Sequence, residues 1–135
     1  MTAAAVVADT HILVWYVGGQ ALSQPAVLAL DAATAADEPI YVSAITLLEL
    51  VYLAEWQRLT AEQVRLVDEA LRAEDSAFEV YPVDERVVRA VAEIPRADIP
   101  DPQDRLIGAT ARVLGVPLVT KDRALRACPA VTTIW

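Results

Sequence analysis

A chain of 135 residues with a hydrophobic fraction of 56% holds enough apolar material for one compact domain, so residues 1–135 are predicted to form a single domain rather than a disordered chain. The formal net charge of −8 argues against a surface that is basic overall and binds nucleic acid through its phosphates. The single cysteine, Cys128, excludes an internal disulfide and a cysteine-rich zinc site, and a small buried side chain is expected there.

The lengths of the apolar runs and the positions of the basic residues further limit which kind of protein this chain can be. No run is long enough to cross a bilayer, and no Lys or Arg precedes the first run, so we expect a cytoplasmic protein without a signal peptide or a membrane partner. All 11 basic residues lie at or beyond Arg58. The group near the C-terminus forms either a local basic rim or ordinary solvated helix faces; its members are Arg105, Arg112, Lys121, Arg123 and Arg126.

Strand-like and helix-like segments alternate along the chain. Capping residues predict helices that begin at Ser23, Ser43, Thr60, Asp84 and Asp101, and Gly115 ends the last of them. Short apolar segments rich in Val and Ile predict strands over residues 4–8, 39–42, 78–81, 116–119 and 131–134. The prolines within residues 94–102 predict a loop. This alternation indicates an α/β protein with a mostly parallel sheet covered by helices on both faces.

Four carboxylates occupy positions where such a fold binds ligands. Asp9 directly follows the first strand, and Asp122 follows VPLVT with only Lys121 between. Both therefore lie at the carboxyl ends of strands, where ligands bind in open parallel sheets. Glu49 lies among apolar neighbours in LLELV and needs a partner or a metal if it is buried. Asp104 lies in the first turn of a helix, where the dipole favours negative charge.

Each of these acids also has a simpler explanation. Asp9 is suited to cap the following turn, and Glu49 to pair with an arginine from elsewhere in the fold. Asp104 matches the third position of a capping box, and Asp122 suits a turn. Taken together, however, the four acids would repel one another unless divalent cations neutralised them. Ligands that are all oxygen favour Mg²⁺ or Mn²⁺, which activate water for phosphodiester hydrolysis.

Four strings in order carry a family resemblance. VADTHILVWY, VSAITLLEL, DPQDRLIGATA and VPLVTKDRAL resemble the PIN-domain family, and more narrowly the VapC-type toxins of bacterial toxin–antitoxin pairs. The resemblance covers essentially the whole chain. It implies a three-layer α/β/α sandwich with a small, mostly parallel sheet, and a metal-dependent endoribonuclease that uses Mg²⁺ or Mn²⁺.

The resemblance also implies a set of site residues. Carried over by motif, the catalytic and metal-binding acids are Asp9, Glu49, Asp104 and Asp122. Thr120 matches a small hydroxyl residue beside the fourth acid that orients a water or a carboxylate. Asp101 is a companion in DPxDR strings, and we interpret it first as an N-cap and only second as a ligand.

Partners follow from the same resemblance. VapC-type toxins are usually inhibited by a cognate antitoxin and commonly form homodimers. The apolar helix over residues 47–56, which contains Tyr52 and Trp56, is a candidate contact surface. Because aromatic side chains are mostly buried, we instead expect this helix to fill the core.

RNA binding needs positive charge that the chain as a whole lacks. We predict that Arg105, Lys121, Arg123 and Arg126 contact the RNA, and that His11 is a neighbour of the site or a turn residue rather than a base. Two other classes of function compete with the nuclease. One is a PIN-like module that binds RNA or a partner without cleavage. The other is a domain that accepts a phosphoryl group, although such domains usually carry adjacent acids near the first strand.

Overall fold

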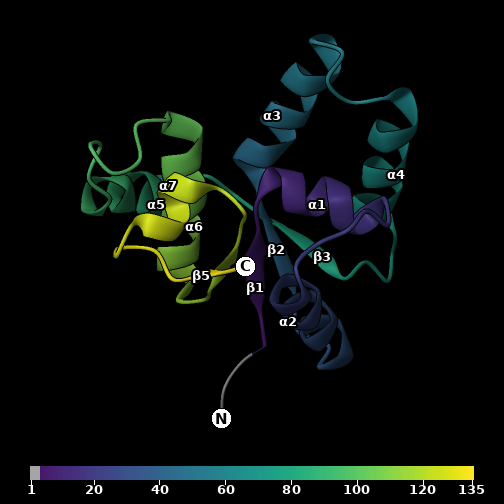
Figure 1. Ribbon diagram of the computed structural model, residues 1–135, viewed down its shortest axis with the longest axis horizontal. Coiled ribbons are helices and arrows are strands. Elements are labelled where there is room, and N and C mark those ends of the chain that lie inside the picture. The colour runs from purple at the N-terminus through teal and green to yellow at the C-terminus, as the bar shows by residue number, and fades with distance from the viewer. Residues whose placement is uncertain (1–3) are drawn as a thin grey trace.

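A fully parallel five-stranded sheet forms the centre of the computed structural model, which describes residues 4–135 (Figure 1). The strands are β1 (Val6–Ala8), β2 (Ile40–Ser43), β3 (Phe78–Tyr81), β4 (Leu118–Val119) and β5 (Thr133–Ile134). Their order across the sheet is β3-β2-β1-β4-β5. Because all strands run the same way, their carboxyl ends meet at one edge, and β1 lies in the middle of it.

Helices connect the strands and form two layers. They are α1 (Thr10–Val17), α2 (Gln24–Ala35), α3 (Ala44–Glu55), α4 (Ala61–Arg72), α5 (Glu85–Ala90), α6 (Pro102–Leu114) and α7 (Arg123–Ala127), with a 3-10 turn, η1, over Val91–Glu93. In Figure 1, α5, α6 and α7 lie on one side of the sheet and α1 to α4 on the other. The predicted three-layer α/β/α architecture is therefore confirmed.

Alternation along β1 divides the core between these layers. Val7 packs with residues of α5, α6 and α7, whereas Val6 and Ala8 pack with residues of α1 and α2. All three are buried, as expected for a central parallel strand whose two faces are both covered. A strand so enclosed is a rigid support for the residue that follows it, Asp9.

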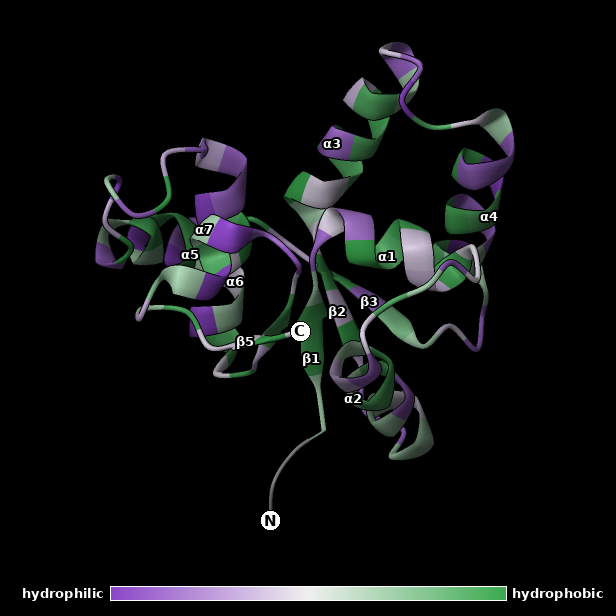
Figure 2. Ribbon diagram, viewed as in Figure 1, coloured by the Kyte–Doolittle hydropathy of each residue, from purple (hydrophilic) through white to green (hydrophobic). Residues whose placement is uncertain are grey.

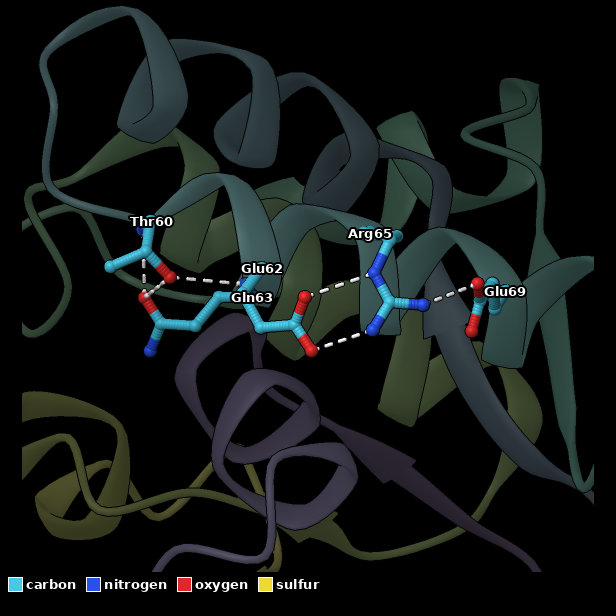
Figure 3. A network of polar contacts seen from close by, with 5 residues as sticks. All are labelled: Thr60, Glu62, Gln63, Arg65 and Glu69. Atoms are coloured by element: carbon cyan, nitrogen blue, oxygen red, sulfur yellow. Dashed lines mark hydrogen bonds and ion pairs between the residues drawn. The ribbon is translucent and has the colours of Figure 1, made fainter.

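Local signals position the helix ends largely as predicted. Ser23, Ser43, Asp84 and Asp101 each accept a hydrogen bond from a backbone N–H in the first turn of their helix. Thr60 and Gln63 form the predicted capping box, which Figure 3 shows beside the ion pairs of α4. Gly115 ends α6 in a left-handed conformation at φ 68°, which a side chain would disfavour.

Two helices were not predicted. Helix α1 follows Asp9 directly, and its sequence THILVWYV is so apolar that no helical period separates a buried from an exposed face. Helix α7 has only five residues, too few to show a period. The predicted strands are all present, but β1, β4 and β5 each begin two residues later than expected.

The expectation that α3 fills the core is wrong. Trp56 is 62% exposed, and Leu47, Leu48, Val51 and Tyr52 are also exposed. The ribbon of α3 in Figure 2 carries the green of hydrophobic residues along much of its length. The reason is geometric, because α3 and α4 extend from the sheet as a pair and only one side of α3 meets the rest of the protein. Cys128 is buried, as predicted. Within residues 4–135, none of the helices combines the length and the apolar character that a membrane span requires.

Candidate active site

A pocket of about 520 Å³ opens at the carboxyl edge of the sheet. Its carboxylates come from four different parts of the chain: the end of β1, the second turn of α3, the start of α6 and the loop after β4. All four predicted acids line it, together with Asp101. The full lining is Asp9, His11, Ile12, Trp15, Glu49, Asp101, Asp104, Lys121 and Asp122.

Asp9 is the most firmly held of these acids. Its backbone N–H donates to the carbonyl of Val119 at 3.0 Å, which anchors the residue to β4. Its Oδ1 accepts from the N–H of Thr10 at 2.7 Å, and its Oδ2 accepts from the hydroxyl of Thr120 at 2.7 Å. Asp9 therefore is the N-cap of α1, as the simpler explanation proposed, and it also lines the pocket. Thr120 orients a carboxylate, one of the two roles predicted for it.

Glu49 lines the pocket because a contact between two hydroxyl groups holds its helix, α3, against α1. The buried hydroxyls of Thr10 in α1 and Thr46 in α3 lie 3.0 Å apart, which fixes the helices against each other. Glu49 follows Thr46 by three residues and so projects from the same side of α3. Its Oε1 is buried and has no hydrogen-bond partner in the described chain. The alternative pairing of Glu49 with an arginine is wrong, because among residues 4–135 no such ion pair forms.

Asp101 and Asp104 come from the first turn of α6. Asp101 Oδ1 accepts from the N–H groups of Gln103 and Asp104 at 2.8 and 3.1 Å, which confirms Asp101 as the N-cap. Asp104 sits at the third helical position but makes no reciprocal bond to the cap. Its side chain is directed instead to the pocket that it lines.

Asp122 combines a capping role with a place in the pocket. Its Oδ2 accepts from the N–H of Leu125 at 2.9 Å, so it begins α7 rather than a simple turn. Its own N–H donates to the hydroxyl of Thr120 at 3.0 Å. Thr120 thus connects Asp9 and Asp122, and it is itself fully buried.

Burial and repulsion by neighbouring charges raise the pKa values of Asp9, Glu49 and Asp104. Burial raises the pKa of Asp9, and burial followed by the charge of Asp9 raises the pKa of Glu49 to about 7. Burial also raises the pKa of Asp104 to about 7, with further contributions from the charges of Asp9, Asp101, Asp122 and Glu49. The carboxylates are therefore close enough to disfavour one another's ionised forms.

A divalent cation fits this donor set. Within residues 4–135, none of the five carboxylates of the pocket forms an ion pair, and one buried oxygen of Glu49 lacks any partner. As the side chains of this part of the chain stand, no three acidic, histidine or cysteine groups surround a common point at which a metal would bind. A cation here would contact one or two carboxylates and keep several waters, as Mg²⁺ usually does, or draw the side chains inward.

Two of the basic residues near the C-terminus do not face the pocket. Arg105 donates to the carbonyls of Val91 and Ile94 at 3.0 and 2.7 Å, and its Nε is buried. The prediction that Arg105 contacts RNA is therefore corrected, because its guanidinium secures the chain that leads into α6. Arg112 likewise pairs with Glu93 at 3.1 Å.

Lys121, Arg123 and Arg126 remain exposed near the pocket. Lys121 lines the pocket itself, while Arg123 and Arg126 line a neighbouring hollow with Trp135. His11 is exposed and lines the pocket in the first turn of α1, as the predicted neighbour of the site rather than a turn residue.

Sequence reasoning missed two residues of this region. Trp15 lines the pocket and lies 5.5 Å from His11, measured between ring centroids. Thr46 supports the position of Glu49 through Thr10. A hydroxyl within the apolar string AITLLEL was a usable signal for Thr46, whereas nothing in the sequence separates Trp15 from a core aromatic.

Comparison with known proteins supplies the family. The sequence pattern of the PIN domain matches residues 6–130. The chain is 32% identical to Ribonuclease VapC22 of Mycobacterium tuberculosis, over 96% of this chain and 98% of that protein.

Solved structures resemble the fold as a whole. The structure of VapBC2 from Rickettsia felis, bound to a DNA fragment from its promoter, includes a chain with a TM-score of 0.71 at 18% identity, with 96% of each chain covered. FitAcB from Neisseria gonorrhoeae gives a TM-score of 0.61 at 26% identity, with 95% of each chain covered. On the match across residues 6–130 and the full-length similarity to a VapC ribonuclease, this chain belongs to the PIN domain family.

Proposed function

We propose that the protein is a VapC-like endoribonuclease that hydrolyses RNA phosphodiester bonds with Mg²⁺ or Mn²⁺, acts in the cytoplasm and is inhibited by a cognate antitoxin. The observation that carries the proposal is the pocket, in which carboxylates from four parts of the chain meet and, within the described residues, none of them forms an ion pair with the neighbouring Lys121 or His11. A cation would relieve the repulsion among these acids, and a buried oxygen of Glu49 without a partner marks one place for it.

The role of each pocket carboxylate depends on how firmly the protein holds it. Asp9 is fixed by Thr10 and Thr120 and provides a carboxylate of constant orientation. Glu49 Oε1 has no hydrogen-bond partner in the described chain, which leaves it available to a cation. Asp9, Glu49, Asp104 and Asp122 would hold the metal. When bound, such a cation polarises a phosphoryl oxygen and stabilises the charge of the leaving oxygen.

Asp101 and Asp122 have a second duty as helix caps. Each carries one oxygen that accepts backbone N–H groups, which leaves the other oxygen for the pocket. Their charges also repel an approaching phosphate unless a cation is present. The carboxylates therefore make RNA binding at the pocket depend on the metal.

The partner assignments rest on the relatives. VapBC and FitAB structures are described as toxin–antitoxin or DNA-bound complexes, which supports a cognate antitoxin for this chain. The exposed apolar face of α3, with Leu47 and Val51, is the surface that we assign to contacts with the antitoxin or with a second copy in a homodimer. An arginine from the antitoxin would suit the pocket, since a guanidinium can replace the charge of the metal.

Cleavage of RNA with and without metal tests the proposal. Purified protein should cut a structured RNA in Mn²⁺ and not in EDTA. Asp104→Asn should lower the rate at least about 100-fold, since changing even an indirect partner of a metal ligand costs about 10- to 100-fold. Glu69→Gln is the matched control, because Glu69 is an exposed acid on α4 that pairs with Arg65. Equal rates for the two variants, or cleavage in EDTA, would contradict the proposal. No cleavage of any RNA in Mn²⁺ would contradict it as well and would favour a non-catalytic binding module.

A further inference from the structure

A row of rings and a cation lies between the carboxylate pocket and the basic hollow beside it. The Nζ of Lys121 is 5.8 Å from the ring centroid of Trp15 and 5.7 Å from that of Trp135. His11 contacts Trp15 in turn, with the two ring centroids 5.5 Å apart and the ring planes inclined by 44°. The members of the row are His11, Trp15, Lys121 and Trp135.

The topology of the sheet explains why these residues meet. Trp15 comes from α1, which begins where β1 ends, and Lys121 lies in the loop after β4. Trp135 follows β5, and the N–H of Thr120 donates to the carbonyl of Ile134 at 3.2 Å, so the ends of β4 and β5 are joined. The row therefore lies along the same edge of the sheet as the carboxylates.

Positive charge continues beyond the row. Arg123 and Arg126 line a hollow of about 400 Å³ together with Trp135. Both arginines are exposed, and in the described chain neither forms an ion pair. They differ in this from Arg105 and Arg112, whose guanidinium groups are bonded to the protein. On a chain of net charge −8, this is where a polyanion can approach.

We propose that Trp15 and Trp135 form a stacking subsite for an unpaired base of RNA next to the carboxylate pocket, with Lys121, Arg123 and Arg126 contacting the flanking phosphates. Aromatic faces beside free cations are the pattern by which proteins bind single-stranded nucleic acid without reading its sequence. A base within a duplex is already stacked and cannot enter between or upon these rings. The identification of RNA as the ligand rests on the proposed function.

A purely structural role for the row makes different predictions. Trp15 and Trp135 also pack against the core cluster of α1 and α2, so the rings contribute to folding whatever else they do. In that case Lys121 merely ties the segment after β5 to α1, and RNA would bind equally well to variants that remain folded. Substitution by leucine removes the π face but keeps an apolar side chain, and substitution by phenylalanine keeps a π face, so the pair separates the two roles.

Binding of a labelled single-stranded RNA, measured by fluorescence anisotropy in an Asp104→Asn background that does not cleave it, is the test. We expect Trp135→Leu and Trp15→Leu to weaken binding about 10-fold each, the usual scale for loss of one stacked base, and Trp135→Phe to weaken it less than about threefold. A duplex of the same sequence should bind at least about 10-fold more weakly than the single strand.

Trp56 provides the matched control. It is an exposed tryptophan with its own cation, Arg58, 5.8 Å from its ring, but it ends α3 and does not line the pocket. Trp56→Leu should leave the affinity for RNA unchanged. Equal affinities for the Trp56, Trp15 and Trp135 leucine variants, or equal binding of duplex and single strand, would overturn the subsite.

A spectroscopic readout covers the case in which a leucine variant fails to fold. The chain has three tryptophans, so in a Trp56→Phe background the fluorescence comes from Trp15 and Trp135 alone. Saturating single-stranded RNA should quench that fluorescence, and unchanged emission at saturation would overturn the proposal. The outcome is separable from the nuclease assignment. A chain that cleaves RNA without quenching lacks the subsite, and a chain that is quenched but never cleaves has the subsite without the activity.

Discussion

The acids of α4 and the acids of the pocket show two ways in which a protein holds negative charge. On α4, Glu62 and Glu69 each pair with Arg65 at 2.6 Å (Figure 3). On the same helix, Asp68 pairs with Arg72 at 2.9 Å. The Arg65 partner holds the pKa of Glu62 below its usual value. In the pocket, by contrast, burial and neighbouring acids raise the pKa values of Asp104 and Glu49 to about 7.

The difference identifies which acids serve the fold and which serve a ligand. Exposed pairs one helical turn apart form wherever a sequence places opposite charges at that spacing, and they contribute little to stability. Half-buried acids without counter-charges lower the stability of the free protein. Such a group persists where its interaction with something outside the chain compensates for the loss.

The largest expected effect is stabilisation by metal. Mn²⁺ at about 100 times its dissociation constant should stabilise the native protein by about 2.7 kcal/mol and raise the melting temperature by roughly 10 °C. Differential scanning fluorimetry measures this rise. Asp104→Asn should remove most of it and Glu69→Gln none. A rise that is the same in both variants would place the cation outside the pocket.

The second effect concerns the residue that connects the acids. Thr120→Val keeps the shape of the side chain but removes the donor to Asp9 Oδ2 and the acceptor for the N–H of Asp122. Because these partners are buried, we expect a loss of about 2 kcal/mol in the free energy of unfolding. Urea denaturation measures it. Thr120→Ser keeps the hydroxyl and should retain most of the stability, and a valine variant as stable as the parent would show that the contacts are not needed.

A smaller effect should appear in the pH dependence of the metal-free protein. A carboxyl whose pKa is raised on folding binds its proton more tightly in the native state, so its ionisation destabilises the fold as the pH rises from about 4 to about 7. Asp104→Asn should therefore be more stable than the parent at pH 8, by about 1 to 2 kcal/mol after allowance for solvent screening.

The decisive measurement is whether the free energy of unfolding of Asp104→Asn is higher or lower than that of the parent. The advantage of the asparagine variant should shrink as the pH falls through the folded-state pKa of about 7, and it should vanish below the ordinary pKa of 3.8, where the parent carboxyl is protonated in both states. Urea denaturation across this pH range in EDTA gives the difference directly. An asparagine variant that is less stable than the parent at pH 8 would mean that Asp104 has a favourable partner in solution.

The smallest effect is expected on α4. Arg65→Gln removes both exposed ion pairs, yet the denaturation midpoint should hardly move, and the small change should disappear in 0.5 M NaCl as salt screens the charges. The loss in the free energy of unfolding of Arg65→Gln is to be compared with that of Thr120→Val. A larger loss for Arg65→Gln than for Thr120→Val would invert the distinction between the two groups of acids.

Sequence patterns predicted the sheet and the acids well because both depend on local signals. An acid that follows a strand-like run, as Asp9 and Asp122 do, lies at the carboxyl end of that strand. The N-caps Ser43 and Asp101 can be recognised from their residue types. Helix α1 was missed because burial on several sides removes the amphipathic period on which a prediction rests.

Contacts between distant segments were beyond the reach of such signals. Arg105 and Lys121 look alike as basic residues of one stretch, but only the fold shows that the first bonds backbone carbonyls and the second lies over two tryptophan rings. The exposure of Trp56 has the same origin. Whether a helix rich in aromatic residues is buried depends on the elements that pack beside it. The composition of the helix does not reveal those elements.

The hydrogen bond between Thr120 and Asp9 joins residues 111 positions apart in the chain. At a synthesis rate of about 5 to 20 residues per second, Thr120 is therefore added roughly 5 to 20 seconds after Asp9, the residue that it orients. Until β4 is added beside β1, the first acid lacks both its backbone anchor and its hydroxyl donor. We expect ribosome-bound chains halted before Leu118 to bind no Mn²⁺, and cation binding by such a halted chain would contradict this. A chain built in this order completes its carboxylate pocket only near the end of its synthesis.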